Sequence, residues 1–135
     1  MSGFRYEMSF IKKFMKTSDF KELKVWQKAI DLTVAIYSIT KQFPPDEKYG
    51  ICSQMRRLAV SIPSNIAEGH GRSTKNDYFH FLSIARGPVC ELQTQLIISE
   101  KLEFISPEDN LILQNQLTEI DKMLVGVMSY LKLNT

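Results

Sequence analysis

The sequence predicts an all-α protein, an antiparallel up-down-up-down four-helix bundle. Four segments repeat apolar residues at steps of three or four, which is the spacing of an amphipathic helix. No segment stands out for the alternation of apolar and polar residues that marks a half-buried strand. Short stretches rich in proline, glycine or polar residues separate the four segments, and short connections make neighbouring helices antiparallel.

The first helix is expected to follow a cap at Ser18 or Asp19 and to end before Pro44, because proline cannot continue a helix. Its apolar stripe is predicted to face the core. The members of this stripe are Leu23, Trp26, Ile30, Val34 and Tyr37, and Phe43 closes it.

The second helix is expected to begin near Asp46 or Glu47. Its predicted buried residues, again at steps of three or four, are Ile51, Met55, Leu58, Ile62, Ile66 and Gly69. Gly69 and Gly71 are expected to stop the helix in left-handed backbone, which glycine adopts easily.

The third helix is expected to be capped by Ser73 or Thr74. Its predicted buried residues are Tyr78, Phe81, Leu82, Ala85, Val89, Leu92 and Leu96. The fourth helix begins at Ser106-Pro107, where serine can cap and proline suits the first helical position. Its predicted buried residues are Leu113, Leu117, Ile120, Leu124, Val127 and Leu131.

The composition is typical of one soluble globular domain. The chain has 135 residues, 44% hydrophobic and 24% charged, and no apolar run reaches the roughly 18 residues that cross a bilayer. We therefore expect a cytoplasmic protein with no membrane partner. Residues 1–17 form a basic and aromatic N-terminal extension, and residues 18–135 form the bundle. The extension is expected to be less ordered, a short amphipathic helix or a docked arm, and an arm for nucleic acid or a membrane surface stays open.

A polar stripe flanks the apolar face of the second helix. Its members are Arg57, Ser61, Asn65, Glu68 and Arg72. Such positions can face water, a ligand or a neighbouring subunit. We expect an interface at Ser61, Asn65 and Glu68, joined by Phe79 of the third helix, whereas Tyr78 and Phe81 are expected in the core.

Pro63 lies within the second helix and has no N–H to donate to the carbonyl of Ala59. A kink is therefore expected at this point. Ser61, Ser64 or a water molecule is expected to satisfy the carbonyl that the proline leaves without its usual donor.

Positive charge is local. Residues 55–88 hold five Lys and Arg residues against two acidic ones, although the net charge of the whole chain is only +2. The candidate nucleic-acid contacts are Arg57, Arg72, Lys75 and Arg56, because guanidinium groups bind phosphates through two parallel hydrogen bonds. Arg56 has a structural alternative, an ion pair with Glu91 of the third helix. The glycines beside Arg72 are expected to form a capping turn rather than a phosphate loop.

The sequence indicates no catalytic residue, metal ligand or cofactor. Asn65 and Glu68 lack a partner nucleophile, and His70 and His80 lack the spacing of a metal site. The two cysteines, Cys52 and Cys90, are expected to be reduced apolar thiols in the core, with a link between them left open.

Several motifs carry a resemblance that covers residues 20 to about 100. They are Leu23-x-Val25-Trp26-x-x-Ala29, Phe43-Pro44 with Glu47-x-Tyr49-Gly50, Gln54-Met55-Arg56-Arg57 through Ser61-Ile62-Pro63-x-Asn65-Ile66-Ala67-Glu68-Gly69, Tyr78-x-x-Phe81-Leu82-x-Ile84-Ala85-Arg86-Gly87, and Glu91-Leu92-x-Thr94-x-Leu96. With these motifs the chain resembles the bacterial four-helix-bundle proteins encoded in intervening sequences of 23S ribosomal RNA genes. Pro88 departs from the family pattern, in which a small residue such as serine commonly follows the glycine. This departure leaves open whether the third helix is regular at Pro88.

The resemblance implies a four-helix bundle that assembles into a homo-oligomeric ring, usually a pentamer, and it implies no enzymatic activity. Members resemble accessory proteins of diversity-generating retroelements, whose basic surfaces engage nucleic acid and a reverse transcriptase. We therefore expect a non-enzymatic oligomeric adaptor that associates with RNA through a local basic patch. The alternative is a scaffold that assembles into a ring and recruits a protein partner without binding nucleic acid.

Overall fold

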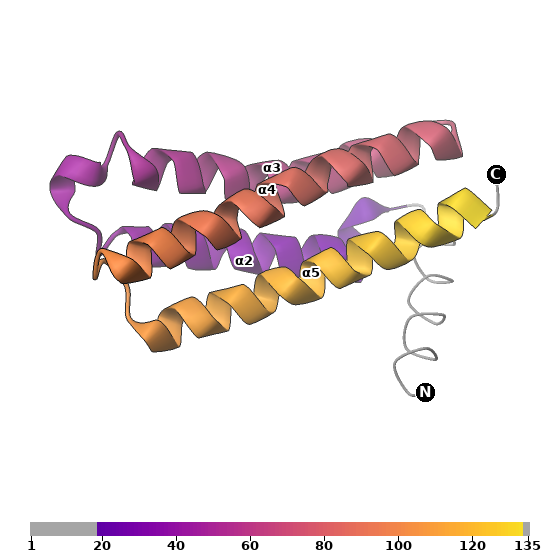
Figure 1. Cartoon of the computed structure of the whole chain (residues 1–135). Helices are drawn as coiled ribbons and strands as arrows, with labels where there is room; N and C mark the ends of the chain where they lie inside the picture. The colour runs from indigo at the N-terminus through magenta and orange to yellow at the C-terminus, as the bar shows by residue number, and fades with distance from the viewer. Residues whose placement is uncertain (1–18, 134–135) are drawn as a thin grey trace.

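The computed structural model describes residues 19–133 (Figure 1). Four α-helices follow one another: α2 (Lys24–Thr40), α3 (Ile51–His70), α4 (Lys75–Lys101) and α5 (Pro107–Leu133). Two short 3-10 turns, η1 (Phe20–Glu22) and η2 (Pro45–Glu47), precede α2 and α3. The predicted all-α four-helix bundle is confirmed. The expectations for residues 1–17, and the cap at Ser18, lie outside the described residues.

Each helix packs antiparallel against the next one in the chain, and α5 closes the bundle by packing against α2 (Figure 1). The α2–α3 and α4–α5 connections lie at the same end of the bundle, and the α3–α4 turn lies at the opposite end. We call the first of these the α2–α3 end. Residues near Thr40 and Ile51 are therefore far from the turn at Gly71.

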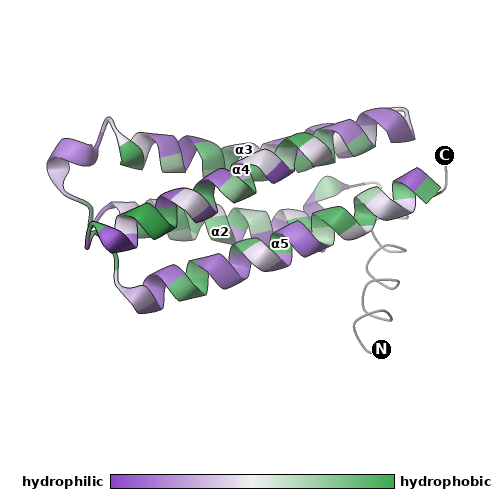
Figure 2. Cartoon of the chain, viewed as in Figure 1, coloured by the Kyte–Doolittle hydropathy of each residue, from purple (hydrophilic) through white to green (hydrophobic). Residues whose placement is uncertain are grey.

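All four helices contribute to one core. Hydrophobic and hydrophilic residues are interspersed along every helix (Figure 2), as expected for amphipathic helices that bury one face. The largest fully buried side chains are Leu23, Leu32, Ile36, Met55, Ile62, Ile66, Leu82, Leu92, Leu96, Leu117 and Ile120. The predicted buried residues of α3, α4 and α5 are confirmed except for three, Ile51, Leu58 and Phe81, which are half-buried.

The caps of the last two helices are confirmed. The Thr74 hydroxyl accepts a hydrogen bond from the backbone N–H of Asp77 at 3.1 Å, and the Ser106 hydroxyl accepts one from Asp109 at 3.1 Å. The starts of the first two helices were predicted too early. Asp19 caps η1 rather than α2, and Pro45 opens η2 before α3 begins. In both cases the residues predicted to begin the α-helix form a short 3-10 turn that precedes it.

The stripe predicted for the first helix is confirmed at its ends, where Leu23 and Phe43 are buried, and was wrong at Val34 and Tyr37, whereas Trp26 and Ile30 are half-buried. Val34 is 64% exposed and Tyr37 is 41% exposed. The buried residues of α2 are instead Val25, Ala29, Leu32, Ile36 and Thr40. The helix α2 carries apolar side chains at the same spacing on two faces. The face that bears Ala29 is buried, because this face packs against α3 and α5.

Two backbone expectations for the second helix were also wrong. None of the described glycines has a positive φ, and the C-cap Gly71 lies at φ −80. Ser61 and Ser64 do not donate to the carbonyl of Ala59, because their hydroxyls bond to the carbonyls of Leu58 and Val60. The Thr33 hydroxyl of α2 lies 3.1 Å from the Ala59 carbonyl oxygen and 2.7 Å from the carbonyl oxygen of Ala29, so its one proton is shared between them. The helices α3 and α4 continue without interruption through Pro63 and Pro88, and the kink at Pro63 stays a prediction.

Candidate nucleic-acid interface

Arg57 is the most available of the predicted nucleic-acid contacts. It is exposed on α3, and its guanidinium donates to the hydroxyl of Ser53 at 3.2 Å. Within residues 19–133 no carboxylate forms an ion pair with it. A solvated guanidinium without an acidic partner keeps its hydrogen-bond donors for a phosphate.

Arg56 does not pair with Glu91, and this alternative was wrong. Its Nε donates to the Thr40 hydroxyl at 2.9 Å, its Nη2 lies 3.4 Å from the carbonyl oxygen of Tyr37, and its guanidinium lies 4.8 Å from the centre of the Tyr37 ring. Residue 56 therefore lies on the side of α3 that faces α2. Its positive charge is positioned by neutral groups and is not neutralised by them.

Arg72 and Lys75 lie at the other end of the bundle. The Arg72 guanidinium lies 2.7 Å from a carboxylate oxygen of Glu68 and stacks 4.7 Å above the Phe81 ring. Lys75 is the first residue of α4 and is exposed. Since α3 is 20 residues long, or about 30 Å, this pair is separated from Arg57 by about 20 Å of helix.

The structure thus divides the predicted basic patch. Arg86, which contributes to the sequence-level excess, is also neutralised, because its Nε lies 2.8 Å from Asp121 Oδ1. This hydrogen bond raises the pKa of Arg86. Arg56 and Arg57 remain together as cations without an acidic partner in the described part of the chain, at the N-terminal half of α3.

Two of the polar residues expected at an interface, Ser61 and Asn65, form side-chain hydrogen bonds within α3. The Asn65 amide donates to the carbonyl of Ser61 at 2.7 Å, and the Ser61 hydroxyl donates to the carbonyl of Leu58 at 2.6 Å. Glu68 is held by Arg72. Phe79 is half-buried and packs against the core. Their part in a subunit interface stays a prediction.

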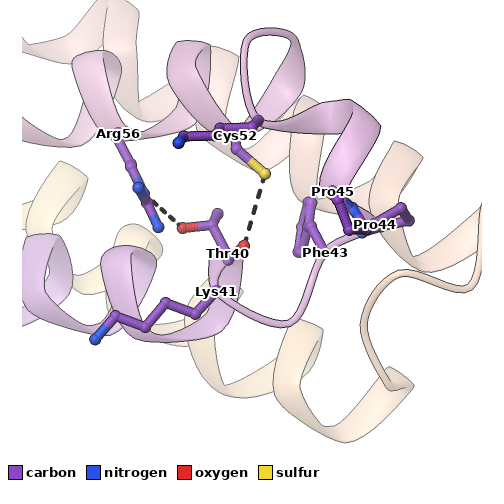
Figure 3. A pocket seen from close by; sticks show the side chains of 8 residues that line it. Thr40, Lys41, Phe43, Pro44, Pro45, Cys52 and Arg56 are labelled. Atoms are coloured by element: carbon purple, nitrogen blue, oxygen red, sulfur yellow. Dashed lines mark hydrogen bonds between the residues drawn. The ribbon is translucent and has the colours of Figure 1, made fainter.

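A pocket that the sequence did not predict lies at the α2–α3 end (Figure 3). It holds about 300 Å³. Its lining residues are Thr40, Lys41, Phe43, Pro44, Pro45, Lys48, Cys52 and Arg56. The only sequence signal for this pocket is the pair Lys41 and Lys48 on either side of Phe43-Pro44-Pro45. Arg56 gives no such signal, because it belongs to α3.

Cys52 forms part of this pocket and is buried, whereas Cys90 is exposed, so the prediction of two core thiols holds for only one of them. The Cys52 thiol lies 3.6 Å from the carbonyl oxygen of Thr40. Burial raises the pKa of Cys52, Arg56 opposes this shift, and Glu47 adds to it. Arg56 and Cys52 both line the pocket, so the positive charge of Arg56 lies at its wall.

No group of three or more His, Cys, Asp and Glu side chains in residues 19–133 could hold a metal ion. The helices described here also lack the combination of length and apolar content that a bilayer crossing requires.

Comparison with known proteins identifies the family. The model of the 23S rRNA-intervening sequence protein family matches residues 21–126. The chain belongs to this family. The match covers the whole bundle except the last turns of α5, so the family assignment and the fold rest on the same residues.

One related structure supports this intervening-sequence family fold. It is a protein of unknown function from the S23 ribosomal protein family of Bacteroides thetaiotaomicron VPI-5482, with 26% identity and a TM-score of 0.72. The similarity covers 78% of this chain and 95% of that one. No curated protein matches the chain. Since the related structure has no known function, activity must be argued from the residues.

Proposed function

We propose that this intervening-sequence family protein is a non-enzymatic, oligomeric adaptor that associates with RNA in the cytoplasm. The observation that carries the proposal is the pair Arg56 and Arg57 on α3, neither of which has an acidic partner in the described residues. RNA is chosen as the polyanion because guanidinium groups bind the phosphates of a nucleic-acid backbone.

The contact surface is centred on the α2–α3 end. Lys41, which follows α2, and Lys48, which follows η2, add two exposed cations to the arginine pair. Contacts between such cations and phosphates release counterions and dominate the affinity for nucleic acid. Arg72 contributes less than the sequence suggested, because Glu68 already neutralises it.

Assembly into an oligomer would place several copies of this cationic surface in one particle. If several copies present the same cations, binding of a second site becomes intramolecular and the overall affinity rises without new contacts. A homo-oligomeric ring, with the pentamer as our first expectation, is therefore part of the proposal.

The test is a titration of fluorescent structured RNA at several salt concentrations. Affinity should fall steeply with salt, and Arg57→Gln should weaken binding and reduce the slope of log K against log salt by about 0.7 to 0.9 per lost contact. Lys122→Gln is the matched control, because Lys122 is an exposed cation on α5 and should leave both quantities unchanged. Salt-independent binding, or equal effects of the two variants, would overturn the proposal.

A second candidate is a protein scaffold that does not bind nucleic acid. Exposed apolar residues on α2 and α3 favour it, since Val34 is 64% exposed and Val60 is 42% exposed. Both lie near the place where the Thr33 hydroxyl meets the carbonyl of Ala59, so they belong to one side of the bundle. Light scattering should then find an oligomer that Val34→Asp reduces to a monomer, together with flat RNA titrations. A monomeric wild-type protein would exclude this candidate.

A further inference from the structure

The pocket at the α2–α3 end combines an anchored cation with an apolar wall. Figure 3 shows the Arg56 side chain reaching from α3 toward Thr40, with the thiol of Cys52 beside it and Phe43, Pro44 and Pro45 opposite. We propose that this pocket binds the terminal phosphomonoester of a nucleotide or RNA chain, with Arg56 as the principal phosphate ligand. The inference deepens the proposed RNA association and rests on it.

Arg56 has hydrogen bonds to spare for such a ligand. A guanidinium carries five N–H donors, and Arg56 directs its Nε to the Thr40 hydroxyl and its Nη2 toward the carbonyl of Tyr37. These contacts fix the side chain before any ligand arrives. A prepositioned guanidinium with remaining donors suits a planar contact with two phosphate oxygens.

The charge around the pocket favours an anion. Three of the lining residues are cationic, Lys41, Lys48 and Arg56, and no lining residue is acidic. The pocket also lies at the N-terminal end of α3, where the helix dipole favours negative charge, since Cys52 belongs to the first turn. Glu47 of η2 carries an opposing charge. It acts on Cys52 but does not line the pocket.

The shape suits a nucleotide better than a bare ion. A volume of about 300 Å³ is at the lower end of the range for small-molecule sites, and the Phe43, Pro44 and Pro45 side offers apolar contact. Tyr49 stands beside the pocket, because the ammonium of Lys48, a lining residue, lies 5.5 Å from the centre of its ring. That ring is 88% exposed and offers a face on which a base can stack.

The decisive experiment compares two RNA oligonucleotides of one sequence, with a 5′-phosphate and with a 5′-hydroxyl, in fluorescence anisotropy. The wild-type protein should bind the phosphorylated form about tenfold more tightly. AMP against adenosine, measured by calorimetry, separates a free nucleotide from a chain end. Tyr49→Ala should weaken AMP but not inorganic phosphate.

Substitutions of Arg56 and of charged residues near it test whether the phosphate binds in this pocket. Arg56→Gln should remove the preference for the 5′-phosphate, and Arg56→Lys should keep part of it because the charge remains. Arg57→Gln removes an equal charge one residue away, so it should weaken both oligonucleotides alike and leave their ratio unchanged. Glu47→Gln should increase the preference, since it removes a negative charge that acts on the lining residue Cys52. Circular dichroism checks that every variant is folded.

The outcomes separate this inference from the proposed function. Equal wild-type affinity for the two oligonucleotides, with steep salt dependence, would overturn the pocket and leave RNA association standing. Binding of AMP that Arg56→Gln abolishes, without any RNA affinity, would support the pocket and overturn RNA association. A 5′-phosphate preference that survives Arg56→Gln would show that the phosphate binds elsewhere and would overturn the inference.

Discussion

Gly69 of α3 lies directly against Phe81 of α4. A Cβ added to Gly69 would stand 2.8 Å from the Cβ of Phe81 and 3.2 Å from the Cδ1 of Tyr78. The two helices approach this closely next to the turn that joins them. The glycine is therefore required for packing, since its backbone is helical and has no positive φ.

Gly69→Ala is expected to destabilise the protein, although alanine is the better helix former. Overpacking at the crossing of α3 and α4 should cost about 1 to 3 kcal/mol of unfolding free energy. Gly126→Ala is the matched control, because a Cβ on Gly126 meets nothing within 4 Å. That variant should gain about 0.5 to 1 kcal/mol. Urea denaturation measures both, and a Gly69→Ala protein as stable as wild type would contradict the packing argument.

Thr33 should matter for stability because of Pro63. The proline cannot donate to the carbonyl of Ala59, and the Thr33 hydroxyl of α2 lies 3.1 Å from this oxygen. The same hydroxyl lies 2.7 Å from the carbonyl oxygen of Ala29, so its one proton is shared between the two carbonyls. Thr33→Val should cost about 1 to 2 kcal/mol, because it leaves this carbonyl without the donor from α2. Thr94→Val should cost less, since the Thr94 hydroxyl bonds only to Cys90 of its own helix.

A double-mutant cycle isolates this contact. In a Pro63→Ala background the restored N–H can bond to the carbonyl of Ala59, so Thr33→Val should lose most of its effect. An equal cost of Thr33→Val in both backgrounds would show that the hydroxyl acts in another way. The measurement is again the unfolding free energy in urea.

The sequence predicted α4 and α5 well and α2 poorly, and the reason is physical. The caps at Thr74 and Ser106 are local signals, and a single apolar stripe follows each of them. In α2 two apolar stripes have the same period, so periodicity alone cannot say which one meets the other helices.

The candidate site was predictable only in part. Arg56 and Arg57 were identified from their chemistry, but the partner of Arg56 depends on which side of α3 faces α2. The expected antiparallel pairing of the second and third helices suggested Glu91 as a partner of Arg56, whereas Arg56 donates a hydrogen bond to Thr40 of α2. The pocket is lined by residues of α2, of the α2–α3 connection and of α3. No local sequence pattern indicates that these residues lie together.

Glu103 is expected to limit stability. It has a φ of 63, in the left-handed region that is unfavourable for residues other than glycine. Around it the N–H of Phe104 bonds to the carbonyl of Ser99 at 2.8 Å, as in helix ends that usually carry glycine at this position. Glu103→Gly should raise the unfolding free energy by about 1 kcal/mol, measured by thermal denaturation. Glu103→Ala is the control and should bring no such gain, because alanine keeps the Cβ that disfavours this backbone.

The two thiols should differ in their reaction with a disulfide reagent. Cys90 is exposed, whereas burial of Cys52 raises its pKa, so less of it is the reactive thiolate at any given pH. Cys52 in a Cys90→Ser protein should therefore react more slowly near neutral pH than the exposed Cys90 in a Cys52→Ser protein. Equal rates would contradict this ordering.

Charged neighbours should move the Cys52 profile in opposite directions. Arg56 lowers the pKa of Cys52 and Glu47 raises it, so in the Cys90→Ser background Arg56→Gln should shift the rate profile to higher pH and Glu47→Gln to lower pH. Lys122→Gln should leave it in place. A shift in the same direction for both charge variants would point to changed exposure of the thiol. Opposite shifts would show that both charges act at the wall of the pocket where the phosphomonoester is proposed to bind.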